Sequence, residues 1–245
     1  MSRRAPDSPL PFSKVMDRQD WGDLELYTQV IDRYPGALQG QHAVRRWEYA
    51  MAFRAIDTWE KTCHPQESEL YRNDPLEILD VGGAGSNFWQ VLTALTSADI
   101  HIVDPAAVPG AEQAPGRYQV FACPVEDFAA ATRHSRFDIL TCISVIEHVE
   151  DVRRFFRACS MLLKPGGLVV FTTDFWDKEG PDVAHFHWMR KRIYNEGSIR
   201  KLLTGLRELG YRSFGAADWS YHGDQVYDYS VCSVAMTKRV GGIGG

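Results

Sequence analysis

Two features that would place a protein in or across a membrane are missing from this sequence of 245 residues. No window is apolar over the roughly 20 residues that a membrane-spanning helix needs. The first six residues, MSRRAP, carry two arginines, but prolines and polar residues follow where a secretory signal would have an apolar core. We therefore expect a protein without a membrane partner.

The sequence also has little of what nucleic-acid-binding and metal-binding proteins use. Its net charge is −5, and residues 189–192 are the main cluster of basic side chains, so nucleic acid is disfavoured as a partner. The five cysteines form no C-x-x-C pair. Four of them fall within apolar patterns: Cys123, Cys142, Cys159 and Cys232. This usage predicts reduced core cysteines, a cytoplasmic location and no metal site.

The sequence does contain enough apolar residues, 44%, for one full core. Residues 1 to about 15 are rich in proline and polar side chains, which predicts a disordered or loosely draped start. Helical patterns follow at 20–34 and 41–62. The second pattern repeats apolar residues at helical spacing and should pack on something: Val44, Trp47, Met51, Ala55 and Trp59. We predict a helical extension over residues 1–74, ending in a linker.

Beyond residue 75 the pattern changes to short apolar strands that alternate with helices. The expected strands are 76–81, 100–103, 118–122, 137–143, 168–173, 211–214 and 229–237, and the expected helices include 88–95, 149–163 and 198–209. Such alternation predicts the α/β class with a doubly wound, mostly parallel sheet of seven strands. No helix separates the last two strands, so they should be antiparallel. The domain would span 75–240, and 241–245 would be a flexible tail.

The first strand-to-helix turn of such a fold is the place to look for a ligand. It reads ILDVGGAGSNF, and neither Gly82 nor Gly83 begins a complete G-x-G-x-x-G fingerprint for a dinucleotide. Asp80 ends the apolar strand, where a carboxylate is costly unless it meets donors or a cation. Asp104 ends the next strand and suits the two hydroxyls of a ribose. NAD and S-adenosylmethionine both contain a ribose, and the broken fingerprint argues against NAD.

Five motifs in order make the chain from about residue 76 to 175 resemble the class I S-adenosylmethionine-dependent methyltransferases. They are LDVGGAGS, HIVDP, CPVEDF, FDILTCISVIEHVED and LLKPGGLVVFTTDF. Each is common alone, but the series at these separations is specific. The resemblance implies a Rossmann-like fold, S-adenosyl-L-methionine as the cofactor, and transfer of a methyl group to an O or N atom of a small-molecule acceptor.

The resemblance also implies roles for individual residues. It places Asp80 and the turn of Gly82, Gly83, Ala84 and Gly85 at the methionine end, Asp104 and Pro105 at the ribose, Val125 and Glu126 at the adenine, and Ser144 and His148 beneath the sulfonium. Ala84 and Ser86 replace two glycines of the family pattern, and both are small enough for close approach. Pro124 replaces the acid that often meets adenine, which leaves Glu126 or Asp127. Acids also favour any helix start, so that pattern fits an ordinary helix as well.

A general base is needed only if the acceptor must lose a proton, as a hydroxyl would. His187 and His185 lie after the fifth strand, on the expected ligand side, and are the candidate catalytic residues. Their spacing falls short of a metal site. Tyr221 and His222 would form another part of the acceptor rim, and the N-terminal helical extension would act as a lid or line the acceptor pocket. Two rival functions remain: an NAD-dependent oxidoreductase, and a cofactor-binding module without catalysis.

Overall fold

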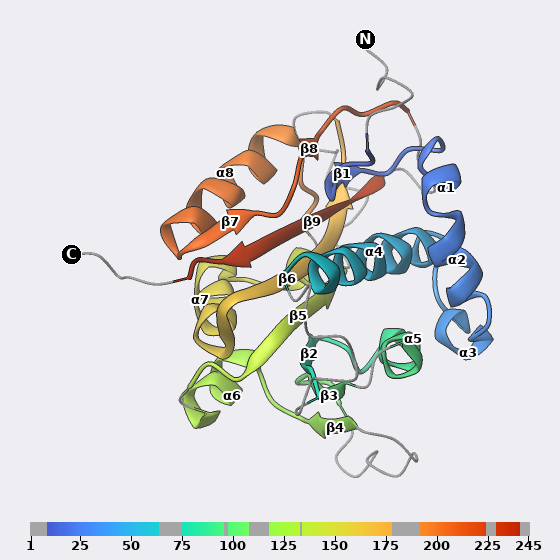
Figure 1. Cartoon of the computed structure of the whole chain (residues 1–245). Coiled ribbons are helices and arrows are strands. Elements are labelled where there is room, and N and C mark those ends of the chain that lie inside the picture. Colours follow the sequence, from blue (N-terminus) through green and yellow to red (C-terminus); the bar gives the residue numbers. More distant parts are fainter. Residues whose placement is uncertain are drawn as a thin grey trace.

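The structure is a computed structural model, and it describes residues 9–63, 75–95, 98–107, 118–132, 134–177, 192–223 and 229–240. Helices cover both faces of one central sheet (Figure 1). The strands are β1 (Ser13–Val15), β2 (Glu77–Val81), β3 (Asp99–Val103), β4 (Tyr118–Phe121), β5 (Phe137–Ile143), β6 (Leu163–Phe175), β7 (Tyr211–Ser213), β8 (Ala217–Asp218) and β9 (Ser230–Lys238). The helices are α1 (Asp20–Asp23), α2 (Glu25–Ile31), α3 (Pro35–Leu38), α4 (Arg45–Cys63), α5 (Phe88–Leu95), α6 (Val125–Thr132), α7 (Val152–Leu162) and α8 (Glu196–Glu208), with a 3₁₀ turn η1 (Ile146–His148).

The sheet runs in the order β4-β3-β2-β5-β6-β9-β1-β8, and β7 pairs with β9 beside β1. Strands β2 to β6 are mutually parallel, whereas β9 is antiparallel to both β6 and β7. The predicted α/β class, the mostly parallel sheet and the antiparallel last pair are thereby confirmed. Because each parallel crossover must pass over a face of the sheet, the intervening helices cover both sides.

Two strands go beyond the seven that the sequence predicted, and one of them corrects an expectation. Residues 13–15 were expected to be loosely draped, but they form β1, which is buried and pairs with β9 and with β8. Three residues are too few to show a period of two, and the neighbouring prolines hide the strand further. β6 also begins five residues earlier than predicted, because the KPGG segment continues in extended form.

The N-terminal helices belong to the core of the molecule. α4 lies across the face of β5, β6 and β9 (Figure 1), and the whole apolar stripe predicted for it is buried: Val44, Trp47, Met51, Ala55 and Trp59. This confirms that the stripe packs. α6, α7 and α8 cover the opposite face. Residues 13–63 thus share one sheet and its hydrophobic core with the rest of the chain.

Three cysteines, Cys142, Cys159 and Cys232, are buried with free thiols. Burial raises the pKa of each of these thiols above its ordinary value. In the described part of the chain, no helix is long and apolar enough to cross a membrane. The same residues contain no group of three or more His, Cys, Asp and Glu side chains placed to hold a metal ion.

Candidate cofactor and active site

The order of the strands reverses between β2 and β5, which defines the topological switch point of the sheet. β3 and β4 follow β2 on one side, and β6 follows β5 on the other. Ligands of open α/β sheets bind beyond the carboxyl ends of the strands at such a point. Asp80 of β2 and Thr141 of β5 face each other across it in register. The acid singled out from the sequence therefore lies at the position where this fold binds ligands.

Asp80 is fully buried at the switch point. Its Oδ1 accepts a hydrogen bond from Thr141 Oγ1 at 2.7 Å. Burial raises the pKa of Asp80 to about 7, although the hydroxyls of Thr141 and Ser86 favour the ionised form. Its Oδ2 makes no hydrogen bond of good geometry within the described residues. A cation placed beside a carboxyl group whose pKa is raised favours its ionised form.

The glycine turn after β2 brings backbone close to this carboxylate. Gly82 has a φ of 75°, in the left-handed region that favours glycine, and its N–H donates to the Val103 carbonyl at 2.8 Å. A Cβ at Gly82 would overlap Val145, and a Cβ at Gly83 would overlap the Asp80 carboxylate. Gly85 meets open space instead, with nothing within 4 Å of a Cβ. The turn therefore packs tightly on the strands and leaves its outer backbone open to a ligand.

Asp104 ties the end of β3 to the same turn. Its Oδ2 accepts from the Ala84 N–H at 3.1 Å, and its Oδ1 accepts from the Ala106 N–H at 2.8 Å. The side chain is largely buried, and Pro105 beside it is exposed. Since a carboxylate has about four acceptor sites, both oxygens can still accept from hydroxyl groups. Asp104 and the glycine turn are thus brought together as the sequence motifs require.

The other predicted cofactor contacts are less closely joined to the turn. Val125 is buried and Glu126 half-buried in the first turn of α6. Their roles at the adenine stay predictions, because an ordinary helix start has the same pattern. His148 ends η1 and is exposed. Its role near the sulfonium is also untested.

Ser144 follows β5 and is held by a residue from α4. The Ser144 and Thr172 hydroxyls each donate to Glu48 Oε1 at 2.6 Å. Thr172 Oγ1 in turn accepts from the Ser144 N–H at 3.0 Å. Glu48 is fully buried, and its Oε2 accepts from Arg45 Nη1 at 2.9 Å. Ser144 has a φ of 52°, which a non-glycine residue adopts rarely. This network fixes the loop after β5 in an otherwise costly conformation.

Glu48 and Arg45 were not predicted as site residues, although the sequence contains a signal for them. Glu48 lies four residues after Val44 and three before Met51, so it falls on the buried face of α4. A carboxylate within an apolar stripe predicts a buried partner. Burial alone would lower the pKa of Arg45, but Glu48, Tyr49 and Glu147 raise it above its ordinary value. Arg45 thus stays a cation among buried acids.

The N-terminal segment touches the glycine turn at one further place and is tied together by a buried ion pair. Gln41 Nε2 donates to the Gly85 carbonyl at 2.9 Å, directly on the glycine turn. Nearer β9, Lys14 Nζ pairs with the buried Asp20, whose Oδ2 also accepts from Trp47 Nε1 at 3.0 Å. The contacts of Asp20 anchor β1, α1 and α4 to one another.

Aromatic rings and a histidine lie beyond the end of β6. The Tyr221 ring is 6.5 Å from that of Phe175 and 6.1 Å from that of Trp176, measured between centroids. His222 Nε2 is 3.7 Å from Asp17 Oδ2. The acceptor rim at Tyr221 and His222 stays a prediction. The candidate bases His185 and His187 lie outside the described residues.

Comparison with known proteins identifies a methyltransferase domain in this chain. The sequence model of a methyltransferase domain matches residues 45–212. A ubiquinone biosynthesis O-methyltransferase of Azotobacter vinelandii is 34% identical over 102 residues, which are 40% of this chain and 44% of that one. Another of the same name, from Neisseria meningitidis serogroup A, is 51% identical over 49 residues, 20% of each chain. The chain thus spans less than half the length of these curated relatives.

Solved structures share the fold at low sequence identity. A carbon methyltransferase, DszA, superposes with a TM-score of 0.58 at 17% identity, over 83% of this chain and 56% of that one. The cyclase SpnF gives 0.57 at 17% identity, over 80% and 84%. These likenesses show the fold alone. The match of the methyltransferase-domain model covers well over half of the sequence and includes every motif that carried the resemblance. The predicted family is therefore confirmed, and this chain belongs to the methyltransferase-domain family.

Proposed function

We propose that this protein transfers a methyl group from S-adenosyl-L-methionine to an oxygen or nitrogen atom of a small-molecule acceptor. The observation that carries the proposal is the buried Asp80 at the switch point, beside a glycine turn to which Asp104 is bonded. The relatives named O-methyltransferases support oxygen as the acceptor atom. Nucleic acid and membrane are not proposed as partners, and the cytoplasmic location stays a prediction from the free cysteines.

The residues present fit this cofactor. S-adenosylmethionine carries an ammonium group and supplies a methyl group that its sulfonium already activates. Asp80, Glu48 and Glu147 are buried carboxylates around the carboxyl ends of β2 and β5, with Arg45 as a counter-cation. The open backbone at Gly85 leaves room for close approach. Asp104 would hold the ribose, Ser144 would border the sulfonium, and Val125 and Glu126 would flank the adenine.

The work left to the protein is alignment and exclusion of water, because the methyl group needs no enzymic nucleophile. Glu48 holds Ser144 and Thr172 together, so α4 fixes the loop that borders the reacting centre. Gln41 covers the glycine turn from the same N-terminal segment. We propose that residues 41–48 form one wall of the acceptor pocket and limit the access of water.

A hydroxyl acceptor must lose a proton, which requires a base near it. His187 and His185 remain the proposed bases. His222 is a further candidate, because it lies beside the Asp17 carboxylate and Tyr221 at the proposed rim. Single alanine variants of the three histidines distinguish between them. Loss of the true base should reduce turnover and leave cofactor affinity unchanged.

Calorimetric titration with S-adenosylmethionine, S-adenosylhomocysteine and NADH tests the proposal. Binding of the two sulfur ligands and not of NADH is expected. Binding of NADH alone would instead favour the oxidoreductase. Binding of the sulfur ligands without turnover on any hydroxyl or amine acceptor would favour the non-catalytic module. Absence of binding by either sulfur ligand would overturn the proposed function.

A further inference from the structure

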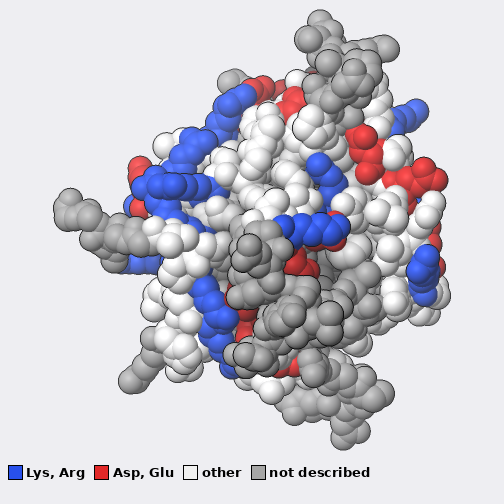
Figure 2. Space-filling model, in the orientation of Figure 1, with Lys and Arg blue, Asp and Glu red and all other residues white. Residues whose placement is uncertain are grey.

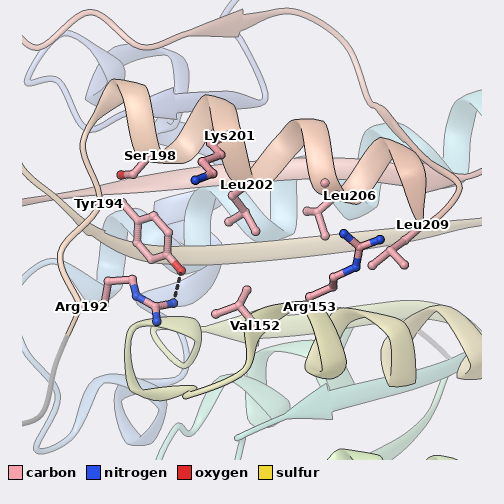
Figure 3. A pocket seen from close by; sticks show the side chains of 10 residues that line it. Val152, Arg153, Arg192, Tyr194, Ser198, Lys201, Leu202, Leu206 and Leu209 are labelled. Carbon is pink, nitrogen blue, oxygen red and sulfur yellow. Dashed lines mark hydrogen bonds between the residues drawn. The ribbon is translucent and has the colours of Figure 1, made fainter.

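A cavity lies on the face of the sheet opposite α4, between α7 and α8 (Figure 3). Its volume is about 440 Å³, within the range of small-molecule pockets. Apolar side chains from the two helices form its floor: Val152, Leu202, Leu206 and Leu209. No residue of the glycine turn, Asp104 or the Glu48 network lines it. The cavity is therefore distinct from the proposed methyl-transfer site.

The rim of this cavity is basic. Three cationic side chains line it, Arg153, Arg192 and Lys201. Arg153 pairs with Glu208 of α8 at 3.2 Å, so Arg192 and Lys201 are the cations left to meet an anion. Arg192 Nη1 donates to the Tyr194 hydroxyl at 3.3 Å, which directs the guanidinium along the opening (Figure 3). Lysine and arginine side chains also gather over α7 and α8 in the space-filling view (Figure 2). An apolar floor under a positive rim is complementary to a molecule with an apolar body and an anionic head.

Gly205 gives an independent reason to regard the cavity as a ligand site. It lies inside α8 and lines the cavity. Glycine destabilises a helix interior relative to alanine. A Cβ at Gly205 would meet nothing within 4 Å, so packing does not require glycine there. The physical effect of this glycine is to keep the cavity open at a cost in helix stability.

We propose that the cavity between α7 and α8 binds a small amphiphile that carries one carboxylate and an apolar chain. The chain lies over Leu202 and Leu206, beside Gly205, and the carboxylate meets Lys201 and Arg192 at the rim. The anionic head is required because the rim offers cations and the Tyr194 hydroxyl. The apolar body is required because the floor offers no hydrogen-bonding side chain.

The proposal is tested with decanoate as the probe, by calorimetry below its micelle concentration and by displacement of anilinonaphthalene sulfonate fluorescence. We expect decanoate to bind, and decanol and decyltrimethylammonium to bind at least about tenfold more weakly, because one charged hydrogen bond is lost or reversed. Lys201→Gln should weaken decanoate binding about fivefold or more. Arg200→Gln is the matched control, since Arg200 adjoins Lys201 but pairs with Glu196 outside the cavity.

Gly205→Trp is the blocking variant. It should abolish decanoate binding, leave S-adenosylhomocysteine affinity unchanged and not lower the melting temperature. Gly205→Ala controls for the helix, and should raise the melting temperature by about 2 °C. Failure of decanoate to bind, equal binding of the three probes, or equal binding by wild type and Gly205→Trp would each overturn the proposal. None of these outcomes bears on methyl transfer, which the sulfur ligands test separately.

Discussion

Asp104 reaches the Ala84 N–H over 20 residues of chain, whereas Glu48 reaches Ser144 over 96 and Thr172 over 124. The first contact lies in the part of the ligand-binding edge that is formed by β2, β3 and the glycine turn after β2, which we call the cofactor half. The second belongs to the acceptor half, where α4 meets the ends of β5 and β6. The cofactor half is built from consecutive strand and turn units, and the acceptor half from segments that only the folded chain brings together.

The two halves also differ in how their buried acids are stabilised. Asp80 has a hydroxyl neighbour and a pKa raised to about 7, so its carboxyl is only partly ionised at neutral pH in the free protein. Glu48 has a guanidinium and two hydroxyls, so every one of its oxygens is bonded. The buried acid of the cofactor half, Asp80, thus lacks a cationic partner that a ligand could supply. The buried acid of the acceptor half, Glu48, already has its cation in Arg45.

The largest effect is expected from Glu48→Ala. This change leaves Arg45 buried without its partner and removes the acceptor of two hydroxyls. Breaking one side of a buried ion pair costs about 3–5 kcal/mol, so the free energy of unfolding measured by urea denaturation should fall by that order. Glu48→Gln keeps an oxygen for the hydroxyls and should lose less.

Lys61→Ala is the control on the same helix. Lys61 pairs with Asp57 at the exposed end of α4, where its own side chain is 72% exposed. Such surface pairs contribute less than about 1 kcal/mol. If Glu48→Ala costs no more than Lys61→Ala, the acceptor half does not depend on this buried network.

The next effect is expected in the cofactor half, from Asp104→Ala. The change removes the acceptor of the Ala84 and Ala106 N–H groups and the proposed ribose ligand. We expect S-adenosylhomocysteine affinity to fall on the order of 100-fold in calorimetric titration, since two charged hydrogen bonds are lost. The exposed Asp23 supplies the control, Asp23→Ala, which should bind normally. Affinity comparable with wild type in Asp104→Ala would refute the ribose assignment.

The cofactor half was readable from the sequence because its signals are local. The helix predicted at 88–95 is α5, and β2, β3 and β5 begin and end within a residue of their predicted bounds. A buried parallel strand is a short apolar run, and the turn after it needs glycine. Asp80 and Asp104 then stand at the strand ends that the fold places side by side.

The acceptor half was not readable in this way because its contacts are distant in sequence. β1 is three residues long, and its partner β9 lies more than 200 residues further on. The role of Glu48 can be recognised only in the folded chain, where Ser144, Thr172 and Arg45 surround it. The apolar stripe predicted the helix α4, but it did not predict the roles of Glu48 and Arg45. A helical period shows which face is buried and not which groups that face contacts.

A smaller effect is expected from Asp80 in the cofactor half, where burial of the carboxyl makes the free energy of unfolding depend on pH. Burial raises the pKa of Asp80 from 3.8 to about 7, so folding disfavours its ionised form. The free energy of unfolding should therefore fall as pH rises between these two values and level off above about 7. Asp80→Asn removes this contribution. Its unfolding free energy should vary less over the same pH range and exceed that of wild type at neutral pH.

Cofactor affinity should depend on pH in the opposite direction. An ammonium group beside Asp80 favours the carboxylate, so below pH 7 binding must release a proton. Affinity should then rise with pH, approaching tenfold per unit below about 7, and the calorimetric enthalpy should depend on the buffer. Asp80→Asn should bind more weakly and lose both dependences. A pH-independent affinity in wild type would show that Asp80 does not meet the cationic end of the ligand.

The smallest effect is expected at Ser144, where the two halves meet. Ser144→Ala and Ser144→Gly both remove the hydrogen bond to Glu48, but only alanine keeps the cost of a side chain at a φ of 52°. The glycine variant should therefore be more stable than the alanine variant by about 1 kcal/mol in urea denaturation.

Ser160 in α7 supplies the matched comparison for Ser144, because its backbone is helical. There the order should reverse, with alanine more stable than glycine by about 1 kcal/mol. The same order at both positions would mean that residue 144 does not have a positive φ in the folded protein. Opposite orders would show that the fold holds residue 144 at a positive φ, the strained conformation in which the Ser144 hydroxyl reaches Glu48.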